Sequence, residues 1–114
     1  MRMLPAEAFR LRVYCGESDR HGRIALHEAI VRAAHEAGLA GATVVRGSMG
    51  FGAQHRIHTA RVLRLAEELP VVVELVDDRA HIDAFLPTLR AIATRGLITL
   101  ERVEVLAQSP APGD

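Results

Sequence analysis

The run PVVVELVDD, from Pro70 to Asp78, decides the fold. Its apolar residues are interrupted only by Glu74, and their number and branching predict a central strand buried on both faces. A lone carboxylate there is costly unless it is paired, so we expect Glu74 to meet an arginine across a subunit interface. Asp77 and Asp78 favour N-cap positions and predict a helix directly after this strand.

Downstream, apolar residues recur at helical spacing. Pro87 lies inside this pattern and predicts a kink, and Gly96 is expected to end the helix. Residues 98–105 predict a last strand, in which a phase slip near Arg102 indicates a bulge. The apolar face of the helix comprises Ile82, Phe85, Leu86, Leu89 and Ala93.

Upstream, apolar and polar residues alternate over residues 9–14 and predict a first strand. Ser18 and Asp19 are expected to cap a helix over residues 23–37, which ends at Gly38. A short β-branched run over residues 42–46 predicts the second strand. The apolar face of this helix comprises Leu26, Ile30, Ala33, Ala34 and Ala37.

The order is therefore strand–helix–strand, a long connection, and strand–helix–strand. Two such right-handed crossover units predict an α+β fold of the ferredoxin-like βαββαβ kind, a four-stranded antiparallel sheet with two helices on one face. We expect one domain over residues 1–107 and a disordered tail over 108–114. The helices cover one sheet face only, so the other face predicts an oligomer.

Composition limits the possible partners. The chain has 114 residues with 14 basic and 14 acidic side chains, and this balance gives no electrostatic reason to bind nucleic acid. Every basic residue is arginine, so an anion site must use guanidinium groups, backbone N–H groups or imidazole. The single cysteine, Cys15, fits a buried apolar role in a reducing compartment, and with no apolar signal segment visible we expect the cytoplasm.

The segment over residues 47–69 is the main candidate for function. It opens on GSMGFGAQ, whose glycines let backbone N–H groups approach an anion, and Arg46 and Arg56 flank it. The alternative is a turn that needs its glycines for geometry alone. Residues 61–65 fit a strand and a helix equally well. Glu17, Asp19 and His21 form a polar loop that invites acid–base chemistry, but nothing positions a substrate there, and we expect no enzyme.

At Gly50-Phe51-Gly52-Ala53-Gln54 the chain resembles the PII signalling proteins, which carry Gly-Phe-Gly-x-Gln at the base of their long T-loop. It is still more similar to the small PII-like proteins of the DUF190 family. The shared motifs are Gly16-Glu17, residues 38–44 (GLAGATV), Arg46-Gly47, residues 50–52 (GFG), residues 57–59 (IHT), residues 69–72 (LPVV), Val76-Asp77 and residues 85–87 (FLP).

This resemblance implies a homotrimer with small-ligand clefts between subunits, which in PII proteins take adenine nucleotides. It implies a regulatory protein that binds such an effector and acts through residues 47–69 on a partner, for which a membrane transporter or channel is a plausible candidate. No cofactor and no resident metal are expected. The ligand-binding candidates are Arg46, Gly47, Gly50, Phe51, Gly52, Gln54 and His58.

Two observations leave alternatives open. PII proteins hold phosphates with a lysine-rich loop before the last strand, whereas residues 94–99 here are short and lack lysine, which favours AMP or ADP over ATP. The six histidines also permit a metal-binding module like the copper-tolerance proteins of this fold, with His55 and His58 as the ligands to test.

Overall fold

The computed structural model describes residues 2–51, 58–59 and 69–109. Four strands, β1 (Glu7–Gly16), β4 (Gly41–Arg46), β7 (Pro70–Asp77) and β8 (Leu97–Glu104), form one sheet in the order β4-β7-β1-β8. All neighbouring strands in this sheet run antiparallel. Strands β1 and β4, which α1 connects along the chain, are therefore not neighbours, and β7 lies between them. The predicted ferredoxin-like α+β fold is therefore confirmed.

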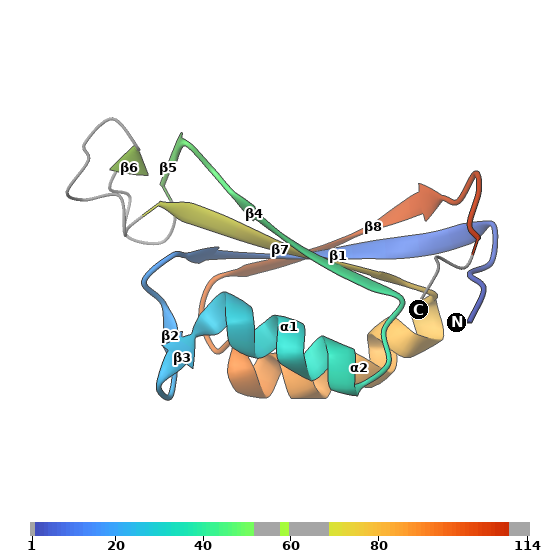
Figure 1. Ribbon diagram of the computed structural model, residues 1–114, viewed down its shortest axis with the longest axis horizontal. Helices are drawn as coiled ribbons and strands as arrows, with labels where there is room; N and C mark the ends of the chain where they lie inside the picture. The colour runs from blue at the N-terminus through green and yellow to red at the C-terminus, as the bar shows by residue number, and fades with distance from the viewer. Residues whose placement is uncertain (1, 52–57, 60–68, 110–114) are drawn as a thin grey trace.

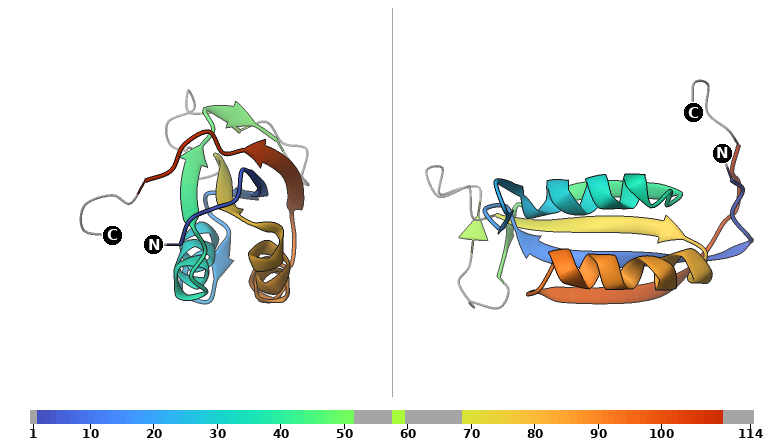
Figure 2. Two further views of the ribbon diagram at one scale, coloured as in Figure 1. Left: turned by 90° about the vertical axis from the view of Figure 1, so that its right-hand side faces the viewer. Right: turned by 90° about the horizontal axis from the view of Figure 1, so that it is seen from below.

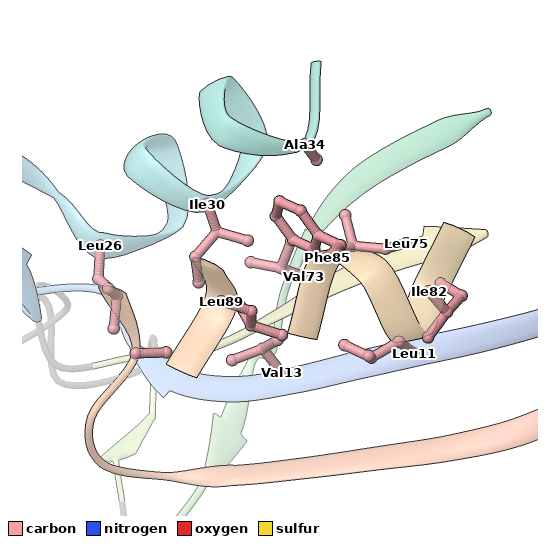
Figure 3. Packing of buried hydrophobic residues seen from close by; sticks show 11 residues of the cluster. Leu11, Val13, Leu26, Ile30, Ala34, Val73, Leu75, Ile82, Phe85 and Leu89 are labelled. Carbon is pink, nitrogen blue, oxygen red and sulfur yellow. The ribbon is translucent and has the colours of Figure 1, made fainter. Parts of the chain in front are cut away.

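The two helices, α1 (Leu26–Glu36) and α2 (Arg79–Ile92), lie side by side on one face of the sheet (Figures 1 and 2). Alternate residues of the strands point into this layer, because successive side chains of a strand face opposite sides. Figure 3 shows the resulting core between the helices and strands β1 and β7. Its most buried members include Leu11, Val13, Ile30, Leu75, Ile82 and Leu89.

Strand β7 differs from the expectation of burial on both faces. Val71, Val73, Leu75 and Asp77 are buried, whereas the alternate residues from Pro70 to Val76 are only half-buried. One face of the strand meets the helices, and the other belongs to a sheet face that no helix of the described residues covers (Figure 1). We call this second surface the open face.

One row of apolar side chains crosses the open face at a single level. In the strand register Val45 lies opposite Val72, Val72 opposite Tyr14, and Tyr14 opposite Leu97. Val45, Tyr14 and Leu97 are exposed in the single chain, Leu97 by 58%. This apolar row spans all four strands and is the part of the open face nearest the segment 47–69.

Charged residues occupy the middle of the open face. Arg12 lies opposite Glu74, and its Nε donates to Glu74 Oε2 over 2.9 Å. Arg12 and Arg10 also contact the same carboxylate oxygen of Glu101, at 3.0 and 2.9 Å. The expectation that Glu74 pairs with an arginine is confirmed, but the arginine belongs to the same chain rather than to a neighbouring subunit.

The first helix begins later than predicted. Residues 20–25 form a small hairpin, β2 (Arg20–His21) with β3 (Ile24–Ala25), so α1 starts only at Leu26. Gly22 turns the hairpin with φ of 63°. The N-cap is Ala25, without a side-chain hydrogen bond, and Asp19 instead accepts from the backbone N–H of Gly16. The buried face is Leu26, Ala29, Ile30 and Ala34, whereas Ala37 is exposed.

Helix α2 and strand β8 correct two further expectations, the helix end at Gly96 and the bulge near Arg102. The helix continues through Pro87 to Ile92, and it ends before Gly96. Gly96 turns the chain into β8 with φ of 102°. The pairing of β8 with β1 is regular from Glu104 to Leu97, so the predicted bulge near Arg102 is wrong. The phase slip arises because Leu100 and Val103 lie on opposite faces of a regular strand.

The predicted caps of α2 have separate roles. Asp78 is the N-cap and accepts a hydrogen bond from the backbone N–H of His81 over 2.8 Å. Asp77 is fully buried and accepts from Arg2 instead. Near the C-terminus, Gln108 accepts from the backbone N–H of Leu4 over 2.6 Å, and residues 110–114 lie outside the described residues. Both chain ends therefore lie at the same end of the sheet (Figure 1).

Candidate functional site

The described candidate residues belong to the C-terminal end of β4 and to a short ribbon after it, at the end of the sheet opposite the chain termini (Figure 1). Strand β4 ends at Arg46, and a short ribbon of β5 (Met49–Gly50) and β6 (His58–Thr59) follows it. Gly50 is paired with His58 in this ribbon. The structure thus brings Arg46, Gly47, Gly50, Phe51 and the backbone of His58 to one end of the sheet.

Gly47 and Gly50 both approach Pro70, the first residue of β7. A Cβ on Gly47 would lie 2.8 Å from Pro70 Cγ, and one on Gly50 would lie 3.1 Å from the same atom. The backbone N–H of Gly47 donates to the Pro70 carbonyl over 2.8 Å. Close approach to Pro70 therefore explains Gly47 without a ligand, and for this position the geometric alternative has direct support.

Other candidates are only partly described. Phe51 is 62% exposed at the end of the described segment, and Met49 beside it is also exposed. Gly52, Gln54, His55 and Arg56 lie outside the described residues, as does the side chain of His58. Their predicted roles stay predictions.

At this site Arg46 has an ion-pair partner that the sequence did not predict. Arg46 Nε donates a hydrogen bond to Glu17 Oε2, which forms an ion pair between the end of β4 and the residue that follows β1. From the sequence, Glu17 is a candidate only for acid–base chemistry. The sequence holds one hint of this pairing, because the shared family motifs include both Gly16-Glu17 and Arg46-Gly47. Membership in these motifs does not by itself show that Glu17 and Arg46 are in contact.

Cys15 precedes this pair on β1 and packs against the hydrophobic core. Burial, with a smaller contribution from the charge of Asp19, raises the pKa of the Cys15 thiol to about 11. The thiol is therefore protonated at neutral pH, which makes it a poor nucleophile. This agrees with the expectation of an apolar structural role.

One acidic group in the described part of the chain has the spacing of a metal site: Asp77, Asp78 and His81, whose ligand atoms lie within 4.8 Å of one another. These atoms already have structural partners. Asp77 holds Arg2, and Asp78 accepts from the backbone N–H and faces the ring of His81. The group is therefore a helix cap joined to an ion pair.

The connection between α2 and β8 is as short as the sequence indicated. The helix ends at Ile92 and the strand begins at Leu97. Arg95 is the only basic residue between them. A lysine-rich phosphate loop of the PII kind has no room at this place.

Comparisons with known proteins agree with this geometry. The model of the DUF190 family, described as an uncharacterized ACR family, matches residues 8–105. A UPF0166 protein of Aquifex aeolicus is 36% identical over 96 residues, which cover 84% of this chain and 90% of that protein.

Solved structures share the fold at low identity. A putative PII-like signalling protein from Thermus thermophilus has a TM-score of 0.65 at 15% identity, over 90% of this chain and 93% of that one. CPII, a nitrogen regulatory PII-like protein from Thiomonas intermedia bound to ADP, AMP and bicarbonate, has a TM-score of 0.58 at 14% identity, over 87% and 88%. CutA from Xylella fastidiosa has a TM-score of 0.56 at 18% identity, over 90% and 88%.

Among the described residues, neither helix has the length and apolar character that crossing a bilayer requires.

The family match includes residues of all four strands of the sheet and both helices, and the solved structures with this fold include PII-like proteins. The chain therefore belongs to the DUF190 family and has a PII-like, ferredoxin-like fold.

Proposed function

We propose that this protein is a PII-like regulatory protein, a homotrimer that binds an adenine nucleotide, AMP or ADP, in clefts between its subunits. The observation that carries the proposal is the position of Arg46 and the glycine-rich turn at Gly47 to Gly50, at the sheet end where the apolar row of the open face also lies. Val45 of this row and Arg46 are consecutive residues of β4, so the row ends beside Arg46, although the two side chains leave the sheet on opposite faces.

Arg46 has the chemistry for a phosphate. Its side chain is 58% exposed, and a guanidinium binds phosphate through paired N–H donors. The backbone N–H of Gly47 is not an additional donor, because it donates to the Pro70 carbonyl. The short connection between α2 and β8 offers Arg95 and no lysine, which favours one or two phosphates over three.

The open face supports the oligomer. An apolar row from Val45 to Leu97 would otherwise remain in water, and burying it against other subunits removes that cost. The ion pairs of Arg12 with Glu74 and of Arg10 with Glu101 neutralise the charges of the same face within each chain, so the face can be buried without an unpaired charge. Subunits packed through this face would bring a neighbour beside each Arg46.

The remaining parts of the proposal follow from the likeness to PII-like proteins. A solved relative of this fold, CPII, is bound to ADP, AMP and bicarbonate. Ligand binding beside residues 47–69 would favour one state of that segment, which then contacts a partner protein in the cytoplasm, for which a membrane transporter or channel is our candidate. No chemical step is proposed, because the site's role is to bind and signal.

Calorimetric titration of the purified protein with AMP, ADP and ATP, with and without Mg²⁺, tests the proposal. We expect AMP or ADP to bind, and Arg46→Gln to weaken binding by about tenfold, since a charged hydrogen bond contributes roughly 1.5 kcal/mol. Arg32→Gln is the matched control, because Arg32 pairs with Glu28 on the exposed side of α1. Failure of all three nucleotides to bind would remove the proposed ligand class.

The metal-binding alternative remains a prediction. CutA shares the fold. His55 lies outside the described residues, and so does the side chain of His58. Titration with Cu²⁺ and Zn²⁺ tests it directly: stoichiometric binding that His55→Ala/His58→Ala abolishes would favour the metal module over the nucleotide sensor.

A further inference from the structure

We propose that Glu17 competes with anionic ligands for Arg46, so that this ion pair sets the affinity of the nucleotide site and its preference for ligand charge. The inference rests on the proposed function and deepens it. It assigns a role to the Gly16-Glu17 motif, which the nucleotide proposal by itself leaves unused.

The two residues are fixed on either side of one strand. Gly16 is the register partner of Pro70, and Glu17 follows it directly. Arg46 is the register partner of Val71 on the other edge of β7. The Glu17–Arg46 pair therefore bridges the ends of β1 and β4 across the start of β7.

Backbone hydrogen bonds hold both residues in place. The N–H of Glu17 donates to the Leu69 carbonyl, and the N–H of Gly47 donates to the Pro70 carbonyl, each over 2.8 Å. On the other side of Glu17, the carboxylate of Asp19 accepts from the N–H of Gly16 over 2.8 Å. The backbone on both sides of the ion pair is thus fixed by the start of β7.

The two side chains differ in exposure. The Glu17 side chain is 22% exposed, whereas that of Arg46 is 58% exposed. The carboxylate is the anchored member, and the longer guanidinium chain is the one that can turn toward a ligand in solvent. An ion pair this exposed contributes little to folding, so its retention or loss can respond to a ligand at small cost.

The two anions exclude each other where both use the Nε–H of Arg46. The Nε–H that Glu17 accepts is one of the donors that a phosphate uses in a bidentate contact with arginine. A phosphate that takes this donor must displace Glu17 Oε2, and it then lies near a carboxylate of like charge. A neutral nucleoside does not enter this competition, because it gains nothing from Arg46.

Equilibrium titrations with pyrophosphate, AMP, ADP and adenosine test this on four proteins: the natural chain, Glu17→Gln, Arg46→Gln and the double variant. We expect Glu17→Gln to bind pyrophosphate and ADP about three- to tenfold more tightly, the range that loss of an exposed ion pair and of a nearby like charge gives. Adenosine binding should not change. Glu28→Gln, which removes an equal charge from an exposed pair on α1, should leave every affinity as it was.

The double variant separates competition from simple repulsion. If Glu17 acts by occupying Arg46, the gain from Glu17→Gln disappears when Arg46 is already glutamine. A gain that persists without Arg46, or a Glu17→Gln protein that binds these anions no better or worse, overturns the inference. Circular dichroism and solution mass of each variant show whether it is folded and assembled, and Glu17→Ala, which also removes the carboxylate, serves in place of Glu17→Gln if the latter is not.

The probes also distinguish this inference from the proposed function. Pyrophosphate binding that follows the expected pattern, with no binding of AMP or ADP, would uphold the competition and refute the nucleotide site. Nucleotide binding with no pyrophosphate binding to any of the four proteins would refute the competition and leave the nucleotide site standing.

Discussion

The guanidinium of Arg2 donates two parallel hydrogen bonds to the carboxylate of Asp77, each 2.7 Å long, although 75 residues separate the two in the chain. The Asp77 side chain is fully buried, and it also accepts from the backbone N–H groups of Ala40 and Asp78, at 2.9 and 2.6 Å. Arg2 reaches further to the carbonyl of Gly38 at the end of α1. One carboxylate thus ties the N-terminal segment to β7 and to the exit of a helix.

Asp77 makes stability depend on acid pH. Burial by itself would raise the pKa of Asp77, but the hydrogen bonds from Arg2 and from two backbone N–H groups hold it below its usual value. Because the unfolded value is about 3.9, the stabilisation is complete above roughly pH 5 and is lost as pH falls through the lowered folded value. Asp77→Asn should lower the free energy of unfolding at pH 7 by about 1–3 kcal/mol. It should also make the fall of this free energy between about pH 5 and acid pH, the acid limb, less steep.

Urea unfolding between pH 2.5 and 7 measures both effects. Asp83→Asn is the control, because Asp83 forms an exposed i,i+4 pair with Arg79 on α2. An acid limb as steep in Asp77→Asn as in the natural chain would show that other carboxylates carry the dependence.

Gly96 and Gly22 offer a matched pair of left-handed positions. Both have positive φ, but a Cβ on Gly96 would lie 2.7 Å from the Tyr14 carbonyl oxygen, whereas one on Gly22 meets nothing within 4 Å. Gly22→Ala should therefore cost about 1 kcal/mol for the backbone alone, and Gly96→Ala about 3 kcal/mol or more. Thermal and urea unfolding of the two variants compare them, and equal losses would mean that Tyr14 moves aside.

Gly47 tests whether the turn is built around Pro70. Gly47→Ala places a Cβ against Pro70 Cγ, so the variant should be destabilised, and Pro70→Ala in the same chain should relieve the clash. We expect a coupling of about 1 kcal/mol between the two substitutions in a double-mutant cycle of unfolding free energies. Purely additive effects would argue against this contact.

Gly52→Val tests a second glycine of the same motif, which lies outside the described residues. Loss of ligand binding while the assembly stays intact would assign that glycine to the ligand.

The apolar row of the open face should decide assembly. Leu97→Glu introduces a charge directly opposite Tyr14 in this row, and burying it between subunits would be costly. We expect light scattering to show a three-subunit mass for the natural chain and a single-subunit mass for Leu97→Glu. Ala91→Glu, at an exposed position of α2, should leave the mass unchanged. A Leu97→Glu protein that keeps the full assembly would place the interface elsewhere.

The sequence predicted the order of elements well where one local pattern dominates. The apolar run of β7 and the helical spacing after Asp78 were sufficient, because few other structures satisfy them. The local patterns misled in two places. The hairpin over residues 20–25 delays α1, and the supposed bulge near Arg102 is a regular strand with apolar residues on both faces.

The candidate site follows the same rule. The glycine-rich motif located Arg46 and Gly50 at one sheet end, since a turn after a strand stays near that strand. The pairing of Arg46 with Glu17, and of Asp77 with Arg2, could not be predicted from spacing, because each joins residues from opposite sides of an intervening strand or from distant segments. The contact between Glu17 and Arg46 depends on how β1 and β4 align along β7, and this strand register cannot be read from the sequence.

Native mass spectrometry of the protein with increasing ADP or AMP measures subunit number and bound ligand in one experiment, and it tests the central claim most directly. The account predicts a trimer that takes up one nucleotide per subunit, while the Leu97→Glu monomer takes up little, because the cleft needs two subunits. A monomer that binds nucleotide as well as the assembly does, or a trimer that takes up none at saturating concentration, would contradict it.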